Sequence, residues 1–292
     1  MYFRAALTIA VALALSGCAS SGGTRGRAED VGRERYLLGI EAMASGDYEE
    51  AIGHFRQVMR IPGLVQLGAN SRLRIADALF LQEKFEAAIT SYRNFTKEYP
   101  NDANAGYAQF RIGHAFYEQI PGEWFLAPPQ YERQQNFVRQ AAAALKQFVR
   151  LYPTHPLVEQ GQGMLDSCEE QLLAHELYVA RFYFDRDKPH GVVQRLERAF
   201  DRFPEHASTE DNFLMLARAY VSIERLDAAR SMYQAYLDRF PRGEHRAAAQ
   251  SSITVLDAAI QRSAPAVPDE RPSTPEPEPA PEAEGDSEVP AP

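Results

Sequence analysis

The chain has 292 residues, of which 45% are hydrophobic and 24% are charged, so it contains enough apolar material for a substantial folded core. Its formal net charge is −9 at pH 7, but the last thirty residues contain eight acidic side chains and one basic one, so the rest is nearly neutral. A nearly neutral body lacks the basic surface that nucleic-acid binding requires, and we expect no nucleic-acid partner.

Residues 1–17 have the pattern of a secretory signal peptide. Arg4 supplies a positive charge, and Ala5 to Leu15 form an apolar run that is too short to span a bilayer, which takes about 20 residues. The run ends in Leu15-Ser16-Gly17-Cys18, which resembles the bacterial lipobox. We therefore predict cleavage before Cys18 and a covalent lipid on its thiol. The alternative is an ordinary signal peptide that happens to be followed by a cysteine.

The predicted lipid determines where the mature protein resides. A single acyl chain binds a membrane reversibly, whereas several chains anchor a protein stably. Ala19 occupies the position where the familiar inner-membrane retention signal has aspartate, so the resemblance favours the periplasmic face of the outer membrane. Residues 18–30 are rich in glycine and serine, which predicts a flexible tether between the lipid and the folded part.

The body of the chain repeats a helical pattern. An aromatic residue followed by proline closes each unit, because proline prevents the helix from continuing. Small residues recur twelve positions before the proline, and large apolar residues recur eight positions before it. The closing pairs are Tyr99-Pro100, Tyr152-Pro153, Phe203-Pro204 and Phe240-Pro241, and the large residues are Tyr92, Leu145, Leu196 and Tyr233. The pattern resembles the tetratricopeptide repeat, a helix-turn-helix unit.

The fold class predicted from this pattern is all-α, a tetratricopeptide-like solenoid of about five helix pairs. In the preceding helices a small residue follows an aliphatic one, which lets the two helices of a pair approach closely; these small residues are Gly39, Ala76, Gly113, Ala180 and Ala217. A long helix from about 156 to 184 should divide the solenoid into repeats 1–3 (31–155) and a second group with repeats 4 and 5 (156–262). The pairs are expected at 33–62, 70–100, 107–153, 174–204 and 211–241. An ordinary helical bundle is the alternative.

Two segments depart from the repeat. Sixteen extra residues separate the helices of the third repeat and include Trp124, the only tryptophan; connections of this length are usually functional or disordered. Residues 263–292 contain nine prolines and cannot pack a core, so we predict a disordered tail. The tail would serve as a spacer or solvated appendage, or alternatively as a binding motif.

Catalytic and metal-binding patterns are missing from the sequence. The seven histidines do not fall at metal-ligand spacings, and His175-Glu176 lacks the second histidine of a zinc-protease motif because position 179 is valine. Cys168 lies among leucines on a predicted helix, where we expect a small core residue rather than a reactive thiol. We therefore predict no enzyme, no metal and no cofactor beyond the lipid on Cys18.

The inner face of the solenoid is the candidate binding site, because the first helix of each pair lines the concave side in this repeat type. The helical period places an aromatic-rich set of side chains there, suited to an extended peptide with aromatic residues. The set comprises Tyr36, Ile40, Met43, Leu73, Asp77, Phe80, Tyr107, Phe110, His114 and Tyr117. The alternative is that these side chains simply pack against neighbouring helices. Charge substitutions at Tyr36, Phe80 and Phe110 are the test that the sequence suggests.

The lipobox, the lengthened repeats, the insertion and the long joining helix together resemble the BamD (ComL-type) lipoprotein family. The most specific segments are Glu176-Leu177-Tyr178-Val179-Ala180-Arg181-Phe182-Tyr183 and Val192-Val193-Gln194-Arg195-Leu196. The resemblance covers about residues 30 to 250. The turn Asp187, Pro189, His190 and Gly191 departs from the family pattern, as does the acidic tail.

That resemblance implies a place in the machinery that inserts β-barrel proteins into the outer membrane. The N-terminal repeats would receive the C-terminal signals of unfolded barrel precursors, which typically end in an aromatic residue. Residues of about 174–250 would dock against a BamA-type barrel protein, alongside other assembly-machinery lipoproteins. The alternative is a repeat scaffold lipoprotein of another envelope complex that serves a pilus, a secretion channel or division.

Overall fold

The computed structural model describes residues 20–122 and 128–263, and these contain helices and loops but no strand. The predicted signal peptide, Cys18, Trp124 and the tail beyond residue 263 lie outside the described residues. The helices are α2 (Ser20–Ser45), α3 (Tyr48–Met59), α4 (Val65–Leu81), α5 (Phe85–Glu98), α6 (Ala105–Tyr117), the 3-10 turn η1 (Gln130–Glu132), α7 (Asn136–Leu151), α8 (Val158–Phe184), α9 (Pro189–Arg202), α10 (Pro204–Ala207), α11 (Glu210–Ser222), α12 (Leu226–Arg239) and α13 (Arg246–Ser263).

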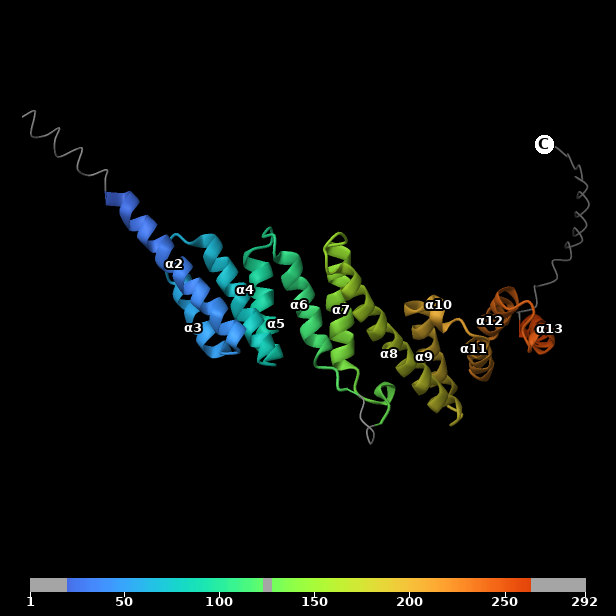
Figure 1. Ribbon diagram of the computed structural model, residues 1–292. Coiled ribbons are helices and arrows are strands. Elements are labelled where there is room, and N and C mark those ends of the chain that lie inside the picture. The colour runs from blue at the N-terminus through green and yellow to red at the C-terminus, as the bar shows by residue number, and fades with distance from the viewer. Residues whose placement is uncertain (1–19, 123–127, 264–292) are drawn as a thin grey trace, which may run out of the picture.

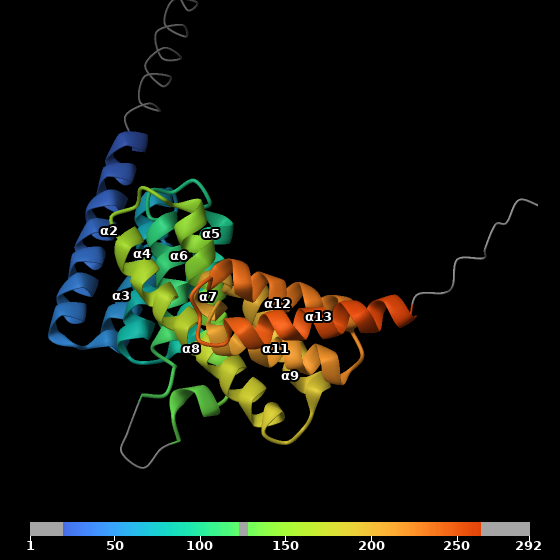
Figure 2. The same cartoon turned by 90° about the vertical axis from the view of Figure 1, so that its right-hand side faces the viewer.

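The helices stack as antiparallel pairs in chain order, from α2 at one end of the row to α13 at the other (Figure 1). Consecutive helices pack against each other from α2 to α10 and from α11 to α13, and α9 packs directly against α11. The long helix α8 contacts both α7 and α9, and Figure 2 shows α11, α12 and α13 running across the direction of the N-terminal helices. The predicted all-α, tetratricopeptide-like solenoid is confirmed. A final helix, α13, extends it beyond the five expected pairs.

Small residues at the crossing points allow the close pairing. Each small residue that follows an aliphatic one in the first helix of a pair is buried. A Cβ atom on Gly39 would lie 2.7 Å from the Phe55 ring, and one on Gly113 would lie 2.7 Å from the Leu145 side chain. Glycine therefore lets a large side chain of the second helix fill the space where a Cβ would stand.

The aromatic-proline pairs end their helices as expected. Tyr99, Tyr152, Phe203 and Phe240 each leave the helical conformation, with φ between −125° and −135°. Proline disfavours the helical region for the residue before it, which accounts for these conformations. Each aromatic residue still donates its backbone N–H to the carbonyl four residues earlier, so the last turn remains closed.

The buried side chains form a small α2–α3 core, a larger N-terminal core and a C-terminal core, and the last two meet along α8. The larger N-terminal core spans α4 to α8 and takes in Phe203 from the end of α9. The C-terminal core joins α8 and α9 to α11, α12 and α13. Cys168 is 1% exposed within the N-terminal core, and burial raises the pKa of its thiol to about 12. Its predicted role as a core residue is confirmed.

The N-terminal segment differs from its sequence-based expectation. Residues 20–30, expected to belong to the flexible tether, form the first turns of α2. Glycine in a helix interior costs only about 1 kcal/mol per residue, and extending an established helix is much easier than nucleating one. Because α2 is held against α3 further along, its N-terminal turns can extend outward from that packed segment.

Candidate functional site

The first helices of the pairs line the inner face of the N-terminal repeats. Beyond the contacts between consecutive helices, α2 also contacts α4, and α6 also contacts α8. First helices that approach one another in this way lie on the more tightly curved side. The helical period then directs one row of side chains from α4 and one from α6 toward this face.

A buried carboxylate, Asp77 on α4, is the centre of the polar contacts there. It is 4% exposed and accepts hydrogen bonds from the Tyr92 hydroxyl at 2.6 Å and the Tyr107 hydroxyl at 2.9 Å. Arg74 Nη1 donates to it at 2.9 Å, and Arg111 Nε lies 4.0 Å away. A buried charge requires such compensation, so these five residues form one unit, which we call the Asp77 hub. It joins α4, α5 and α6.

The hub shifts the titration of the groups around it. Burial, followed by the charge of Asp77, raises the pKa of Tyr107 to about 12 and that of Tyr92 further still. Burial and then the positive charge of Arg111 lower the pKa of His114. Near neutral pH both hydroxyls therefore remain protonated and able to donate, and His114 is neutral.

Aromatic side chains cover the hub on the solvent side. The Arg111 guanidinium lies 3.6 Å from the centre of the half-buried Phe80 ring, and the His114 ring lies 5.0 Å from it. Tyr117, one turn after His114, is also half-buried, and its hydroxyl lies 3.4 Å from Ser167 Oγ on α8. Phe80, His114 and Tyr117, which we call the inner wall, thus offer ring surface to an extended ligand.

The sequence-predicted groove residues fall into four groups. Phe80, His114 and Tyr117 are half-buried on the inner wall, and Asp77 and Tyr107 lie in the hub beneath it. Leu73 and Phe110 are each 3% exposed and belong to the core, so they cannot contact a ligand without unfolding. Tyr36, Ile40 and Met43 lie on α2: Tyr36 packs on the Phe55 ring, Met43 packs against the α2–α3 core and Ile40 is 36% exposed.

Arg74 and Arg111, the two cationic partners of Asp77, were not predicted from the sequence. Arg74, which interacts with both Tyr36 and Asp77, connects the α2 group to the hub. Arg111 donates its Nε–H to the Tyr92 hydroxyl at 3.1 Å. An aspartate on a buried helix face needs a cation or hydrogen-bond donors nearby. Arg74, three residues before Asp77, and Arg111, about one repeat after it, could have been predicted as its partners on that ground.

The segment that resembles the BamD family also contains a buried carboxylate. Glu176 on α8 is 3% exposed and accepts hydrogen bonds from Arg195 at 3.1 Å and Arg198 at 3.3 Å, both on α9. In the turn that departs from the family pattern, Asp187 has a φ of 54°, a left-handed conformation that aspartate tolerates. A Cβ on Gly191 would lie 2.6 Å from the Tyr183 ring, so the close approach of α8 and α9 requires glycine there.

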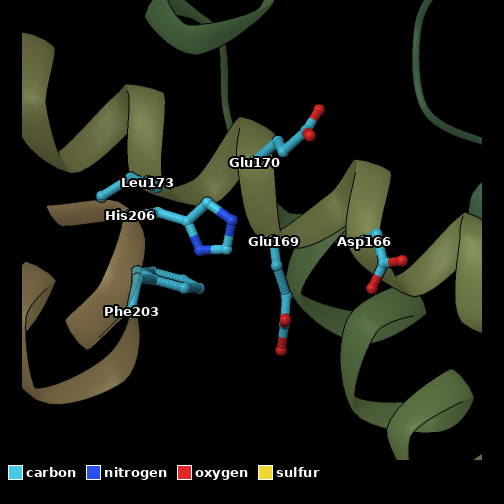
Figure 3. Close-up of a pocket in the computed structure, with 6 residues that line it drawn as sticks. All are labelled: Asp166, Glu169, Glu170, Leu173, Phe203 and His206. Atoms are coloured by element: carbon cyan, nitrogen blue, oxygen red, sulfur yellow. The ribbon is translucent and has the colours of Figure 1, made fainter.

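A cavity of about 270 Å³ lies where α8 meets the end of α9 and α10. Figure 3 shows the Phe203 and His206 rings on one side, and Leu173 and three carboxylates on α8. The lining residues are Asp166, Glu169, Glu170, Leu173, Phe203 and His206. The cavity therefore combines apolar surface with three carboxylates. Among the described residues, no group of three histidine, cysteine or acidic side chains is placed to hold a metal.

Residues 20–122 and 128–263 include no helix that is both long and apolar enough to cross a membrane.

Comparison with known proteins identifies relatives over most of the folded part. A protein-family model, YfiO, described as an outer membrane lipoprotein, matches residues 29–234. The chain is 25% identical over 225 residues to the outer membrane protein assembly factor BamD of Caulobacter vibrioides, covering 75% of this chain and 71% of that protein. It is 23% identical to the factor of the same name from Pasteurella multocida, covering 75% and 84%, and 23% identical to that of Haemophilus influenzae, covering 73% and 81%.

Proposed function

The chain belongs to the YfiO family of outer membrane lipoproteins, and from that membership we propose that it receives unfolded β-barrel precursors on its inner wall. Its relatives are named as outer membrane protein assembly factors, and the role at the outer membrane is that of an accessory factor rather than an enzyme. The proposal adds a ligand, an extended precursor segment, and a place for it, the half-buried rings of α4 and α6.

The observation that carries this proposal is the geometry of Phe80 against Arg111. The ring is held in place from below by the guanidinium at 3.6 Å, and its outer part remains half-exposed. Arg111 is in turn fixed by the Tyr92 hydroxyl. Rigid aromatic surface binds peptide side chains at low entropic cost, because little side-chain freedom is lost on binding. The aromatic ends of barrel precursors, which the family resemblance implies, match such a surface.

Phe80→Ala tests the inner wall, with Phe137→Ala as the matched control because Phe137 is also a partly exposed phenylalanine but lies on α7, a second helix. Binding of a fluorescent peptide from a barrel C-terminus, followed by anisotropy, should weaken about fivefold or more in Phe80→Ala and stay unchanged in Phe137→Ala. Circular dichroism should show equal helicity. Equal affinity of both variants for the peptide would show that the peptide binds somewhere other than the inner wall. Phe110 is unsuitable for this test because it is buried.

The C-terminal repeats supply the second part of the proposal, docking of residues 174–250 to a BamA-type barrel protein. The acid-lined cavity between α8 and α10 supports it, because Phe203 and His206 of this range line one side of the cavity and its carboxylates suit a basic side chain. Affinity capture of the full chain from solubilised outer membranes should recover a barrel protein of that type together with companion lipoproteins. Recovery of pilus, secretion or division components in their place would favour the alternative scaffold role.

The third part is the anchor. The lipobox pattern at Leu15 to Cys18 supports covalent lipid on Cys18 and attachment at the periplasmic face of the outer membrane. Labelled palmitate should enter the protein, and Cys18→Ser should abolish both the label and recovery in the outer-membrane fraction. Unchanged membrane recovery of Cys18→Ser without label would show that another contact holds the protein at the membrane.

A further inference from the structure

Three exposed aromatic side chains lie along the second half of α8 and on the adjoining turn η1. Tyr131, Tyr178 and Phe182 are 36%, 38% and 41% exposed. The Tyr131 and Tyr178 rings are 5.3 Å apart, and Phe182 follows Tyr178 by four residues on the same helix face. Among the described residues the only other exposed large aromatic side chain is Phe137. Grouped apolar rings of this kind mark an interaction surface, since single exposed side chains are the norm.

The patch is held in a fixed shape by the end of the third-repeat insertion. His175 Nδ1 lies 2.5 Å from the Tyr131 carbonyl, which ties η1 to α8. Gln135, 1% exposed, donates from Nε2 to the carbonyls of Gln130 and Arg133 at 2.7 and 2.8 Å. These contacts fix the turn that presents Tyr131. The ring surface is therefore preorganised, which lowers the cost of binding.

A cation completes the patch. The Arg186 guanidinium lies 3.6 Å from the centre of the Phe182 ring, and Arg186 also donates to the Phe182 carbonyl. We call Tyr131, Tyr178, Phe182 and Arg186 the aromatic ladder. Ladders of rings with an adjacent polar group are the surfaces on which proline-rich segments dock, because a polyproline II helix is already extended and packs its rings against aromatic faces.

This chain carries such a segment. Residues 264–292 contain nine prolines and eight acidic residues, with Pro275-Glu276-Pro277-Glu278-Pro279 at the centre. The prolines match the rings, and the glutamates match the charge of Arg186. We propose that the proline- and glutamate-rich tail binds the aromatic ladder of its own chain, in an extended form. This contact is independent of ligand binding at the inner wall.

The tail is long enough to make the contact. The central segment, residues 275–279, lies 12 to 16 residues beyond Ser263, so in polyproline II geometry, at about 3.1 Å per residue, it reaches about 37–50 Å from the end of α13. Between α8 and α13, where the tail begins, lie α9, α11 and α12. With helices packed about 8–10 Å apart, that separation is roughly 40 Å. A tether of this length also gives a high effective concentration, so weak individual contacts suffice.

Site-specific photo-crosslinking in the full chain tests the proposal. A photoreactive benzoylphenylalanine in place of Tyr178 should crosslink to tail peptides within residues 275–292 of the same chain. The same group in place of Leu151, which is 52% exposed at the end of α7, should not. Adding Phe182→Ala should reduce the yield at position 178 about fivefold or more. Equal helicity by circular dichroism would show that all the variants are folded.

Several outcomes would overturn the proposal. These are the absence of tail peptides among the crosslinks from position 178, equal tail yields from positions 178 and 151, and crosslinks only to a second copy or to another protein. To separate chains, the experiment mixes isotopically light and heavy protein. Crosslinks within one chain join peptides of a single isotope, whereas those between copies also join light to heavy.

Discussion

Removal of one hydroxyl from the Asp77 hub is the sharpest test of how the inner wall is held. Tyr92 is fully buried, and its hydroxyl donates to Asp77 at 2.6 Å while accepting from Arg111 Nε at 3.1 Å. Tyr92→Phe removes both hydrogen bonds and leaves the ring in place. A hydrogen bond to a charged group contributes about 1.5–3 kcal/mol. Because Asp77 retains the Tyr107 hydroxyl and Arg74, we expect the free energy of unfolding to fall by about 2 kcal/mol.

The fifth repeat provides a matched control. Tyr233 stands at the same distance before its closing proline as Tyr92 does, and it is 7% exposed. Its hydroxyl has no hydrogen-bond partner in the part of the chain that the structure describes, so Tyr233→Phe should cost less than about 0.5 kcal/mol. Comparison of the two variants thus separates the effect of the hydrogen bonds from the general effect of removing the hydroxyl of a largely buried tyrosine.

Urea unfolding followed by far-UV circular dichroism measures both variants. Stacked repeats need not unfold in one step, so near-UV circular dichroism should be recorded in parallel, and the free energies are comparable only where the two transitions coincide. A cost for Tyr92→Phe no greater than that for Tyr233→Phe would show that the hydroxyl of Tyr92 does not stabilise the hub. An equal cost of Tyr92→Phe in an Asp77→Asn background and in the native chain would show that the two groups are uncoupled.

Three further predictions address helix contacts and pH. Gly113→Val should destabilise the chain by about 1–3 kcal/mol in thermal unfolding, because even its Cβ would lie 2.7 Å from the Leu145 side chain. Gly163→Val, at a position where the space is open, should cost much less. Equal losses of stability in the two variants would contradict the close approach of the helices at Gly113. Glu176→Gln should cost about 1–3 kcal/mol in urea unfolding by weakening its contacts with two arginines, and should leave peptide affinity at the inner wall unchanged. Burial first, and a neighbouring carboxylate second, raise the pKa of Tyr107 from 10.0 to about 12, so its contribution to stability is complete below pH 10 and is lost as pH rises toward 12. Between pH 10 and about 12 the free energy of unfolding should fall less steeply with pH in Tyr107→Phe than in the native chain. An equal slope in the two proteins would contradict the raised pKa of Tyr107.

The order of the helices could be predicted because its causes are local. A proline after an aromatic residue stops a helix wherever it occurs. Glycine is required where two helices cross closely, as at Gly39 and Gly113. The final helix α13 was missed as a separate element because no aromatic-proline pair closes it. Its composition, with alanines and serines around Ile253 and Leu256, gives a weak apolar pattern.

The inner wall was predicted less well because a helix in a solenoid has several neighbours. The helical period places Leu73, Phe80 and Phe110 on the inner side of their helices, yet Leu73 and Phe110 are sealed in the core and Phe80 is half-exposed. Which side chains a neighbouring helix covers depends on the stagger between pairs, which results from packing along the whole stack. The sequence therefore predicts which side chains lie on the inner side of each helix, but not how deeply each one is buried.

The accessible part of the inner wall is small, and this limits how tightly it can hold a ligand. Phe80, His114 and Tyr117 are half-buried, and the charges beneath them already have partners in the hub. A few ring surfaces without an unpaired charge suit an affinity of about micromolar order, since much of the contact energy offsets the lost freedom of an extended chain. At an association rate of about 10⁶ M⁻¹s⁻¹, a micromolar complex dissociates within about one second. Under the proposed function, a precursor can therefore leave this surface without any energy source. Binding at so shallow a site depends on the rigid hub, because the hub holds the rings in place before the ligand arrives.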